Sequence, residues 1–197
     1  MKSPIKKYKT MKMKMNLFLM SLLMLVCVNE SRAQEAPYKM GIGVSTMSMD
    51  AVSFKAFITP KLAIETELGF KWTYPAGFTV NGYSYYGFYR YHYNWLLYTL
   101  ELNPNLLYQS VIKDWDFGRL DWFVGGGFSL GYAWSWGNTG KFGVNAIGGV
   151  ELSFKKIPLA VQVDFRPGYG MLFDSYYTAH YFDWGTNISV RYCFGKK

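Results

Sequence analysis

The sequence predicts an all-β protein: an eight-stranded antiparallel up-and-down transmembrane β-barrel that follows a cleaved signal peptide. Three observations predict it. Apolar and polar residues alternate through segment after segment, as they do in strands with two unlike faces. Aromatic residues make up 20% of the chain, yet no apolar run after the N-terminal leader is long enough for a membrane helix. The alternating segments number eight, and bacterial single-chain barrels have an even number of strands.

The leader, residues 1–33, has the pattern of a secretory signal peptide. Six lysines precede an apolar block over residues 17–28, and Ser31-Arg32-Ala33 follows. Small residues occupy the two positions that signal peptidase requires, so cleavage is expected after Ala33. Residues 1–33 are therefore assigned to the signal peptide and residues 34–197 to one outer-membrane β-barrel domain.

The leader also decides how the charge is interpreted. Seven of the 21 basic residues and one of the 13 acidic residues lie in it, which leaves a net charge of +2 for the mature chain. A charge this small gives no argument for nucleic acid as a partner. Cys193 is the one cysteine after cleavage, so no intramolecular disulfide is expected. Two alternatives stay open, translation from Met11 or Met13 and lipidation of Cys27.

The clearest strand pattern lies in residues 62–72, where apolar residues alternate with Glu65, Glu67 and Lys71. Turn residues separate this segment from its neighbours, and Pro60 supplies a fixed φ with no donor for a sheet. The expected strands cover residues 38–47, 52–58, 62–72, 92–108, 122–134, 144–154, 159–166 and 184–194.

The connections between these strands differ in length. Residues 73–91, 135–141 and 167–183 form long connections that are rich in aromatic residues, and all three fall at one end of the predicted barrel. Bacterial barrels have short periplasmic turns and longer extracellular loops. We therefore expect the N-terminus in the periplasm and the three long connections outside the cell.

The last segment reads W-G-T-N-I-S-V-R-Y-C-F and ends on Phe194, with three residues behind it. It resembles the closing strand of bacterial outer-membrane barrels, and the chain after the leader resembles the small barrel family that includes the OmpA and OmpX types. The resemblance implies a last strand that pairs with the first, a location in the bacterial outer membrane, and lipid and the barrel-assembly machinery as partners. It further implies a role in membrane integrity or surface interaction such as adhesion, without a peptidoglycan-binding domain.

The inward face of the predicted strands carries charges of both signs. Unpaired charges in so narrow an interior are prohibitive, whereas cations and anions neutralise one another in a hydrogen-bonded network. An eight-stranded barrel is just wide enough for its side chains. A packed structural interior is expected, and a narrow proton or ion path is the alternative. The predicted interior charge network consists of Lys55, Glu65, Glu67, Lys71, Glu101, Glu151, Asp164, Arg166 and Arg191.

Aromatic residues divide into two predicted groups. Those near strand ends suit an interfacial girdle, where amphipathic rings lie at headgroup depth. Loop tyrosines suit recognition of an extracellular ligand such as a carbohydrate, because they give contact area at low entropic cost. The predicted girdle consists of Trp72, Trp122, Tyr132, Trp134, Tyr192 and Phe194. The candidate recognition residues are Tyr83, Tyr85, Tyr86, Tyr89, Tyr176 and Tyr177.

Three rival classes of protein fit the sequence less well. A narrow channel for small or hydrophobic solutes fits the barrel. A lipid A-modifying enzyme needs a serine with a histidine base, and Ser175, His180 and Asp183 offer these residue types without a nucleophile elbow or a rigid support. A secreted soluble barrel conflicts with the apolar outward face. We expect no catalytic residue, no metal ligand and no cofactor.

Overall fold

The computed structural model describes residues 36–73, 78–84, 87–93, 97–133, 139–173 and 178–195, and the predicted signal peptide lies outside them. Within these ranges the side chains of residues 36–71, 98–133, 139–173 and 180–195 are described. The described residues form ten strands, of which eight build one closed barrel. None of the described residues belongs to a helix with the length and hydropathy of a membrane span. The barrel strands are β1 (Met40–Met47), β2 (Met49–Phe57), β3 (Leu62–Thr73), β6 (Leu97–Asp114), β7 (Gly118–Ala133), β8 (Thr139–Phe154), β9 (Leu159–Phe173) and β10 (Thr178–Phe194).

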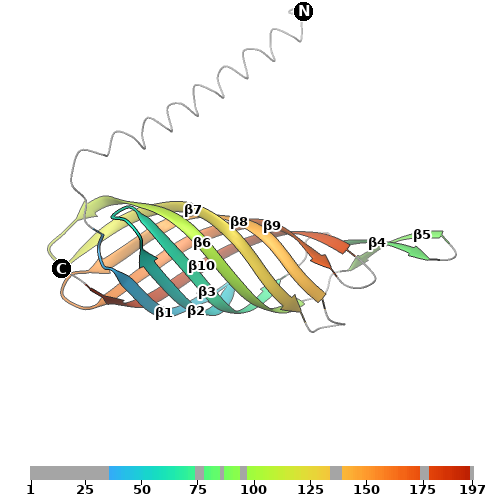
Figure 1. Ribbon diagram of the computed structural model, residues 1–197, viewed down its shortest axis with the longest axis horizontal. Coiled ribbons are helices and arrows are strands. Elements are labelled where there is room, and N and C mark those ends of the chain that lie inside the picture. The colour runs from blue at the N-terminus through green and yellow to red at the C-terminus, as the bar shows by residue number, and fades with distance from the viewer. Residues whose placement is uncertain are drawn as a thin grey trace, which may run out of the picture. The chain divides into compact units, whose positions relative to one another are not determined.

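The barrel runs in the order β1-β10-β9-β8-β7-β6-β3-β2, and every neighbouring pair is antiparallel. Figure 1 shows the strands tilted around a common axis, with the C-terminus at the end that carries the short turns. The last strand pairs with the first, from Met40 opposite Phe194 to Met47 opposite Asn187. The predicted all-β, eight-stranded antiparallel up-and-down barrel is therefore confirmed.

The connection predicted over residues 73–91 was wrong in part. Its sequence forms a two-stranded hairpin of β4 (Phe78–Ser84) and β5 (Gly87–Tyr93), which lies between β3 and β6 in the chain and beyond the end of the barrel in Figure 1. His92, which we expected to begin a barrel strand, belongs to β5, and β6 begins at Leu97. The glycine and asparagine of this stretch suggested a loop, but aromatic and β-branched residues favour paired strands.

The connections predicted over residues 167–183 and 135–141 were also too long. β9 continues to Phe173 and β10 begins at Thr178, so most of residues 167–183 are strand, and β8 begins at Thr139. Pro167 is tolerated because the β8–β9 pairing passes from Gly168 directly to Phe165, where no donor from the proline is needed. Proline and glycine here mark an interrupted ladder and not the end of a strand.

The predicted alternation holds along the barrel wall. Val52 and Leu68 point outward and are more than half exposed, whereas Ser53 and Glu65 are fully buried. The pairing of β3 with β6 keeps its register through Pro104, which lies opposite Thr66. The pairing of β6 with β7 has a bulge between Val111 and Lys113. The strand faces can therefore be assigned from the sequence alone.

Glycines on the inward face make room either for neighbouring side chains or for a neighbouring backbone. At Gly131 the missing Cβ leaves room for charged neighbours, since it would lie 3.0 Å from Cγ of Glu101 and 3.3 Å from Cβ of Lys141. At Gly43 it would lie 1.9 Å from the carbonyl oxygen of Val190. Glycine is required there because the backbones of β1 and β10 approach too closely for a side chain.

Candidate functional site

The centre of the barrel interior is a fully buried cluster of ion pairs. Nζ of Lys55, from β2, donates hydrogen bonds to Glu151 at 2.9 Å and to Gln109 at 2.7 Å. Arg191, from β10, donates from Nη2 to Glu65 at 2.7 Å and from Nη1 to Glu151 at 3.3 Å. Both cations are 0% exposed. Four strands spaced around the barrel thus meet at its axis through charged groups.

A second cluster surrounds Arg166 of β9. Its guanidinium group contacts Glu65 at 2.8 Å, Asp164 at 2.5 Å and Glu67. Gln162 joins the two clusters, because its Nε2 donates to Asp164 at 2.8 Å while its Oε1 accepts from Arg191 at 2.8 Å. One arginine therefore faces three carboxylates and is the most connected cation of the interior.

A buried apolar cluster lies beside these ion pairs. Ala63, Leu107, Phe123 and Ile147 pack together there, and Nζ of Lys55 lies 5.0 Å from the Phe123 ring. Each of the four apolar residues is at most 2% exposed. The cluster fills part of the interior with side chains that offer water no hydrogen-bonding partner.

Tyr38, which precedes β1, packs with Ala160, Cys193 and Phe57 at the short-turn end of the interior. Its hydroxyl donates to both carboxylate oxygens of Glu151 at 3.0 Å, and its ring meets Phe57 edge to face. Burial and the neighbouring Glu151 carboxylate raise the pKa of the Tyr38 hydroxyl well above its usual value. The hydroxyl therefore remains a proton donor, and the residue before the first strand is tied to the central cluster.

The outer half of the interior holds two further ion pairs, Lys141 with Glu101 and Lys71 with Asp183. The Tyr181 ring lies 4.6 Å from Nζ of Lys141. A polar cavity of about 30 Å³ lies beside these pairs, a volume that admits about two water molecules. Arg166, at the inner ion-pair cluster, is one of the residues that line this cavity.

All nine residues predicted for the interior charge network lie inside the barrel. Eight of them are buried, and Lys71 is partly buried near the outer end. Sequence reasoning missed Asp121, Lys141 and Asp183, which also point inward. Strict alternation from the neighbouring inward residues identifies all three. Lys141 and Asp183 were missed because they were placed in loops.

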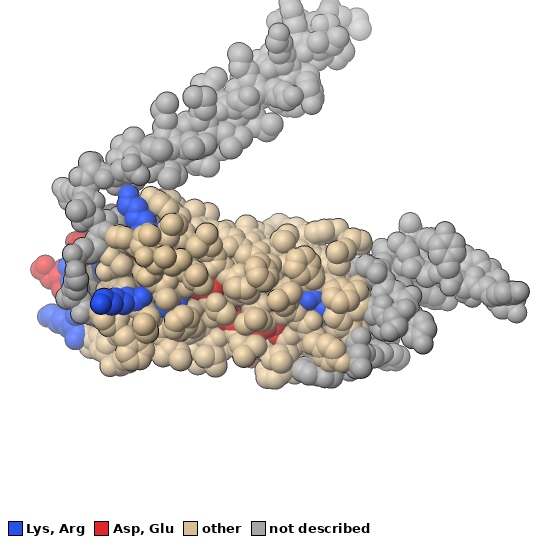
Figure 2. All heavy atoms as spheres, in the orientation of Figure 1, with Lys and Arg blue, Asp and Glu red and all other residues tan. Residues whose placement is uncertain are grey.

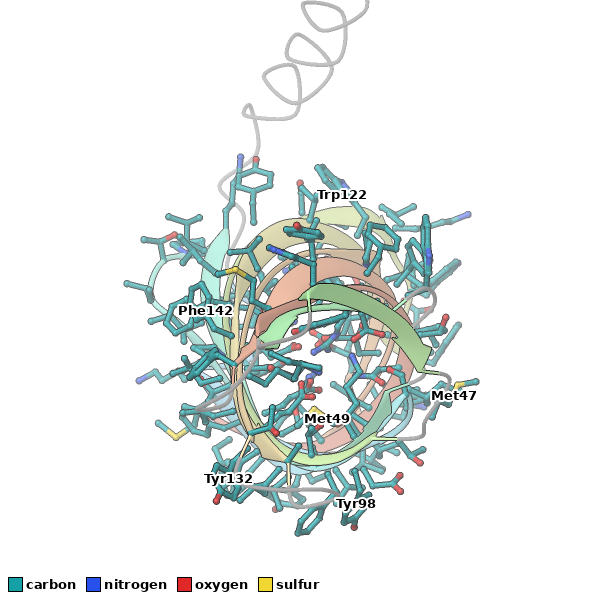
Figure 3. The ribbon with its side chains drawn as sticks, turned by 90° about the vertical axis from the view of Figure 1, so that its right-hand side faces the viewer. Met47, Met49, Tyr98, Trp122, Tyr132 and Phe142 are labelled. Atoms are coloured by element: carbon teal, nitrogen blue, oxygen red, sulfur yellow. The ribbon has the colours of Figure 1, made fainter. Side chains whose placement is uncertain are left out.

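The predicted girdle is described only in part. Figure 3, viewed along the barrel, shows Trp122 and Tyr132 outside the wall while Met49 points into the lumen. Tyr192 and Phe194 are 49% and 45% exposed on the outward face of β10. The side chain of Trp72 and residue Trp134 lie outside the described part of the chain. The predicted girdle left out five further outward aromatics, Phe70, Tyr98, Phe165, Phe182 and Trp184.

The candidate recognition tyrosines lie where side chains are not described. Tyr83 and Tyr89 belong to β4 and β5 by their backbone, and the other four fall outside the described residues. Ser175 also falls outside them. His180 is exposed and contacts the Tyr169 hydroxyl at 2.8 Å. It is three residues from Asp183, which pairs with Lys71, so the two side chains are on opposite faces of β10 and do not form a catalytic pair.

Fold and site together define a closed eight-stranded antiparallel β-barrel whose interior is filled by a hydrogen-bonded network of ion pairs. Comparison of the chain with family models, with curated proteins and with solved structures gave no match. In the part of the chain that is described, no group of three or more His, Cys, Asp or Glu residues is arranged to hold a metal ion.

Proposed function

We propose that this protein is an integral protein of the bacterial outer membrane, a non-conducting barrel that supports membrane integrity and presents its outer end for surface interaction. One observation carries the proposal: the outward face is an uncharged apolar band. On β9 and on β10 from Phe182 onward, every outward residue is uncharged, and many are large and exposed, such as Val163, Ile188 and Tyr192. In water such a surface is an aggregation liability, but in lipid it is required.

The height of the band fits a bilayer. Phe182 and Trp184 mark its outer edge on β10, and Tyr192 and Phe194 mark its inner edge. Phe182 and Tyr192 are ten steps apart, which is roughly 33 Å along the strand at about 3.3 Å per step. A strand tilt of about 40° reduces this to about 25 Å, the usual height of the lipid-facing band. The aromatic residues then lie at the two interfaces.

The two ends of the barrel differ, and this difference supports an orientation of the barrel in the membrane. β2–β3, β6–β7 and β8–β9 are joined by short turns, and we assign this end to the periplasm. The opposite end carries the β4–β5 hairpin, whose sequence is rich in tyrosine. A hairpin that extends beyond the membrane offers a surface to an extracellular ligand or carbohydrate. This end is therefore the one proposed for surface interaction.

The filled interior favours a non-conducting barrel rather than an open channel. Lys55, Glu65 and Arg191 lie in the interior with no solvent exposure, and a buried apolar cluster packs beside them. An ion that crosses this region must break buried pairs, which costs several kcal/mol per ion. The same residues give the barrel rigidity.

The test compares two arginine substitutions in the mature chain refolded into lipid vesicles. Val163, outward on β9 and paired with Ile188 near mid-height, is 42% exposed, and Ile157, in the β8–β9 turn, is 45% exposed. Val163→Arg should lower the free energy of unfolding by about 2–4 kcal/mol and Ile157→Arg by about 0–1 kcal/mol, because the cost of a charge depends on its depth in the bilayer. Equal effects of the two substitutions would refute a lipid-facing wall.

A second measurement checks closure and location. The refolded chain should migrate differently on electrophoresis with and without boiling, and it should fractionate with outer-membrane vesicles. A chain that is soluble without detergent and insensitive to boiling contradicts the proposal.

A further inference from the structure

Lysines lie in or next to the chain segments that are described at the short-turn end of the barrel. We call these five residues the basic rim: Lys39, Lys61, Lys113, Lys155 and Lys156. Lys39 precedes β1, Lys61 lies in the β2–β3 turn, and Lys113 is the second-last residue of β6. The barrel order spaces the four connections around the circumference, so the lysines form a ring. Figure 2 shows charged side chains gathered at this end, while the wall in that view is largely uncharged.

Each lysine position of the basic rim is accompanied by an exposed apolar side chain, which comes from the adjacent turn or, for Lys39, from the neighbouring strand β10. Water gives no reason for this repeated pairing, whereas a membrane interface does. An apolar group enters the boundary of the acyl chains while a lysine extends its ammonium group to the phosphates. The apolar companions are Phe194 beside β1, Ile58 in the β2–β3 turn, Phe117 in the β6–β7 turn and Ile157 in the β8–β9 turn, each at least 45% exposed.

The β6–β7 turn shows the pairing in most detail. Nζ of Lys113 lies 5.5 Å from the centre of the Trp115 ring, and this ring stacks on Phe117 at 5.4 Å. Tryptophan in such a position prefers the headgroup region of a bilayer. The stacked rings and the ammonium group therefore belong at one depth, next to lipid phosphate.

We propose that the basic rim binds the phosphate groups of anionic phospholipids in the leaflet that surrounds the short-turn end. The inference rests on the proposed membrane location and adds a lipid preference to it. Among the described residues outside the interior at this end, five lysines compare with two aspartates, and Asp114 is paired with Lys155 at 2.6 Å. An acidic cell-wall polymer is the weaker partner, because it has no acyl region for the four apolar companions.

The experiment measures the relative association of spin-labelled phosphatidylglycerol and phosphatidylcholine with the mature barrel in mixed vesicles, by electron paramagnetic resonance. Each lysine near the surface favours an anionic lipid by about fivefold at its own contact, so an average preference of about twofold or more is expected over all lipids at the barrel wall. High salt should reduce the preference toward one, because exposed charges are screened.

Two variants make the test specific. The quadruple variant Lys39→Gln, Lys61→Gln, Lys113→Gln and Lys156→Gln should lose the preference, while Asp116→Asn, which raises the net positive charge of the same end, should increase it. An unchanged preference in the quadruple variant, or a wild-type ratio of one at low salt, overturns the inference. The salt series needs no variant and so remains valid if the quadruple variant misfolds. A chain with no immobilised lipid of either kind would instead refute the proposed membrane location.

Discussion

Replacing Arg166 by methionine removes the most connected cation of the interior while keeping most of the side-chain volume. Nη2 of Arg166 lies 2.8 Å from Oε1 of Glu65, a contact that gives about 6 kcal/mol of attraction at an effective dielectric constant of about 20. Desolvation of the two ions offsets much of this gain. In the variant, however, Glu65, Glu67 and Asp164 stay buried without their shared partner, so we expect a loss of about 3–5 kcal/mol in the free energy of unfolding.

The assay is urea unfolding of the barrel in lipid vesicles, followed by tryptophan fluorescence. Lys155→Met is the matched control, because Lys155 pairs with Asp114 at 2.6 Å while both side chains are about half exposed. Lys155→Met should lower the free energy of unfolding by less than about 1 kcal/mol. In a double-mutant cycle, Glu67→Gln should recover part of the Arg166→Met loss, with a coupling energy of about 1–3 kcal/mol. Equal losses for Arg166→Met and Lys155→Met would show that the interior is hydrated and the reasoning wrong.

Two further predictions concern Tyr38, which precedes β1, and the seam where β1 pairs with β10. Tyr38→Phe removes the donor to both oxygens of Glu151 and should cost about 1.5–3 kcal/mol, since the acceptor is charged; a change within the error of urea unfolding would show that water replaces the hydroxyl. Gly43→Ala places a Cβ 1.9 Å from the Val190 carbonyl oxygen and should cost about 1–3 kcal/mol by overpacking, measured as the yield and stability of the heat-modifiable form. Gly148→Ala is its control, because the nearest atom to that Cβ is 3.9 Å away, and equal effects of the two alanines would argue against a tight seam.

Strand faces were predictable because burial in a barrel has a period of two. Glu65 and Glu67 alternate with large apolar residues, and only one assignment places both carboxylates inside. The same rule placed Arg166 and Arg191 in the interior. The pairing of Arg166 with Glu65, Glu67 and Asp164 depends on the stagger between strands, and alternation within one strand carries no information on stagger.

Strand ends were predicted less well, for a local reason. Pro167, Gly168 and Gly170 are residues that terminate strands in most contexts, and the seventh strand was therefore ended at Arg166. In the structure the partner strand β10 supplies pairing through Gly170 opposite Tyr181, which compensates for weak local preference. Such compensation is a tertiary effect and leaves no mark within a single segment. The β4–β5 hairpin was missed for a different reason, because its glycines and asparagine were given more weight than its aromatic and β-branched residues.

The pairing of β1 with β10 has a consequence for how the chain folds. The two strands that close the barrel are the first and the last to be made, so the contact that completes the sheet has nearly the greatest sequence separation the barrel offers. Topologies of this kind fold slowly. A chain that ends at β9 would expose two unpaired edges, on β1 and on β9, and would aggregate. Closure is therefore one late event, and the emerging chain must be held unfolded until its final strand arrives.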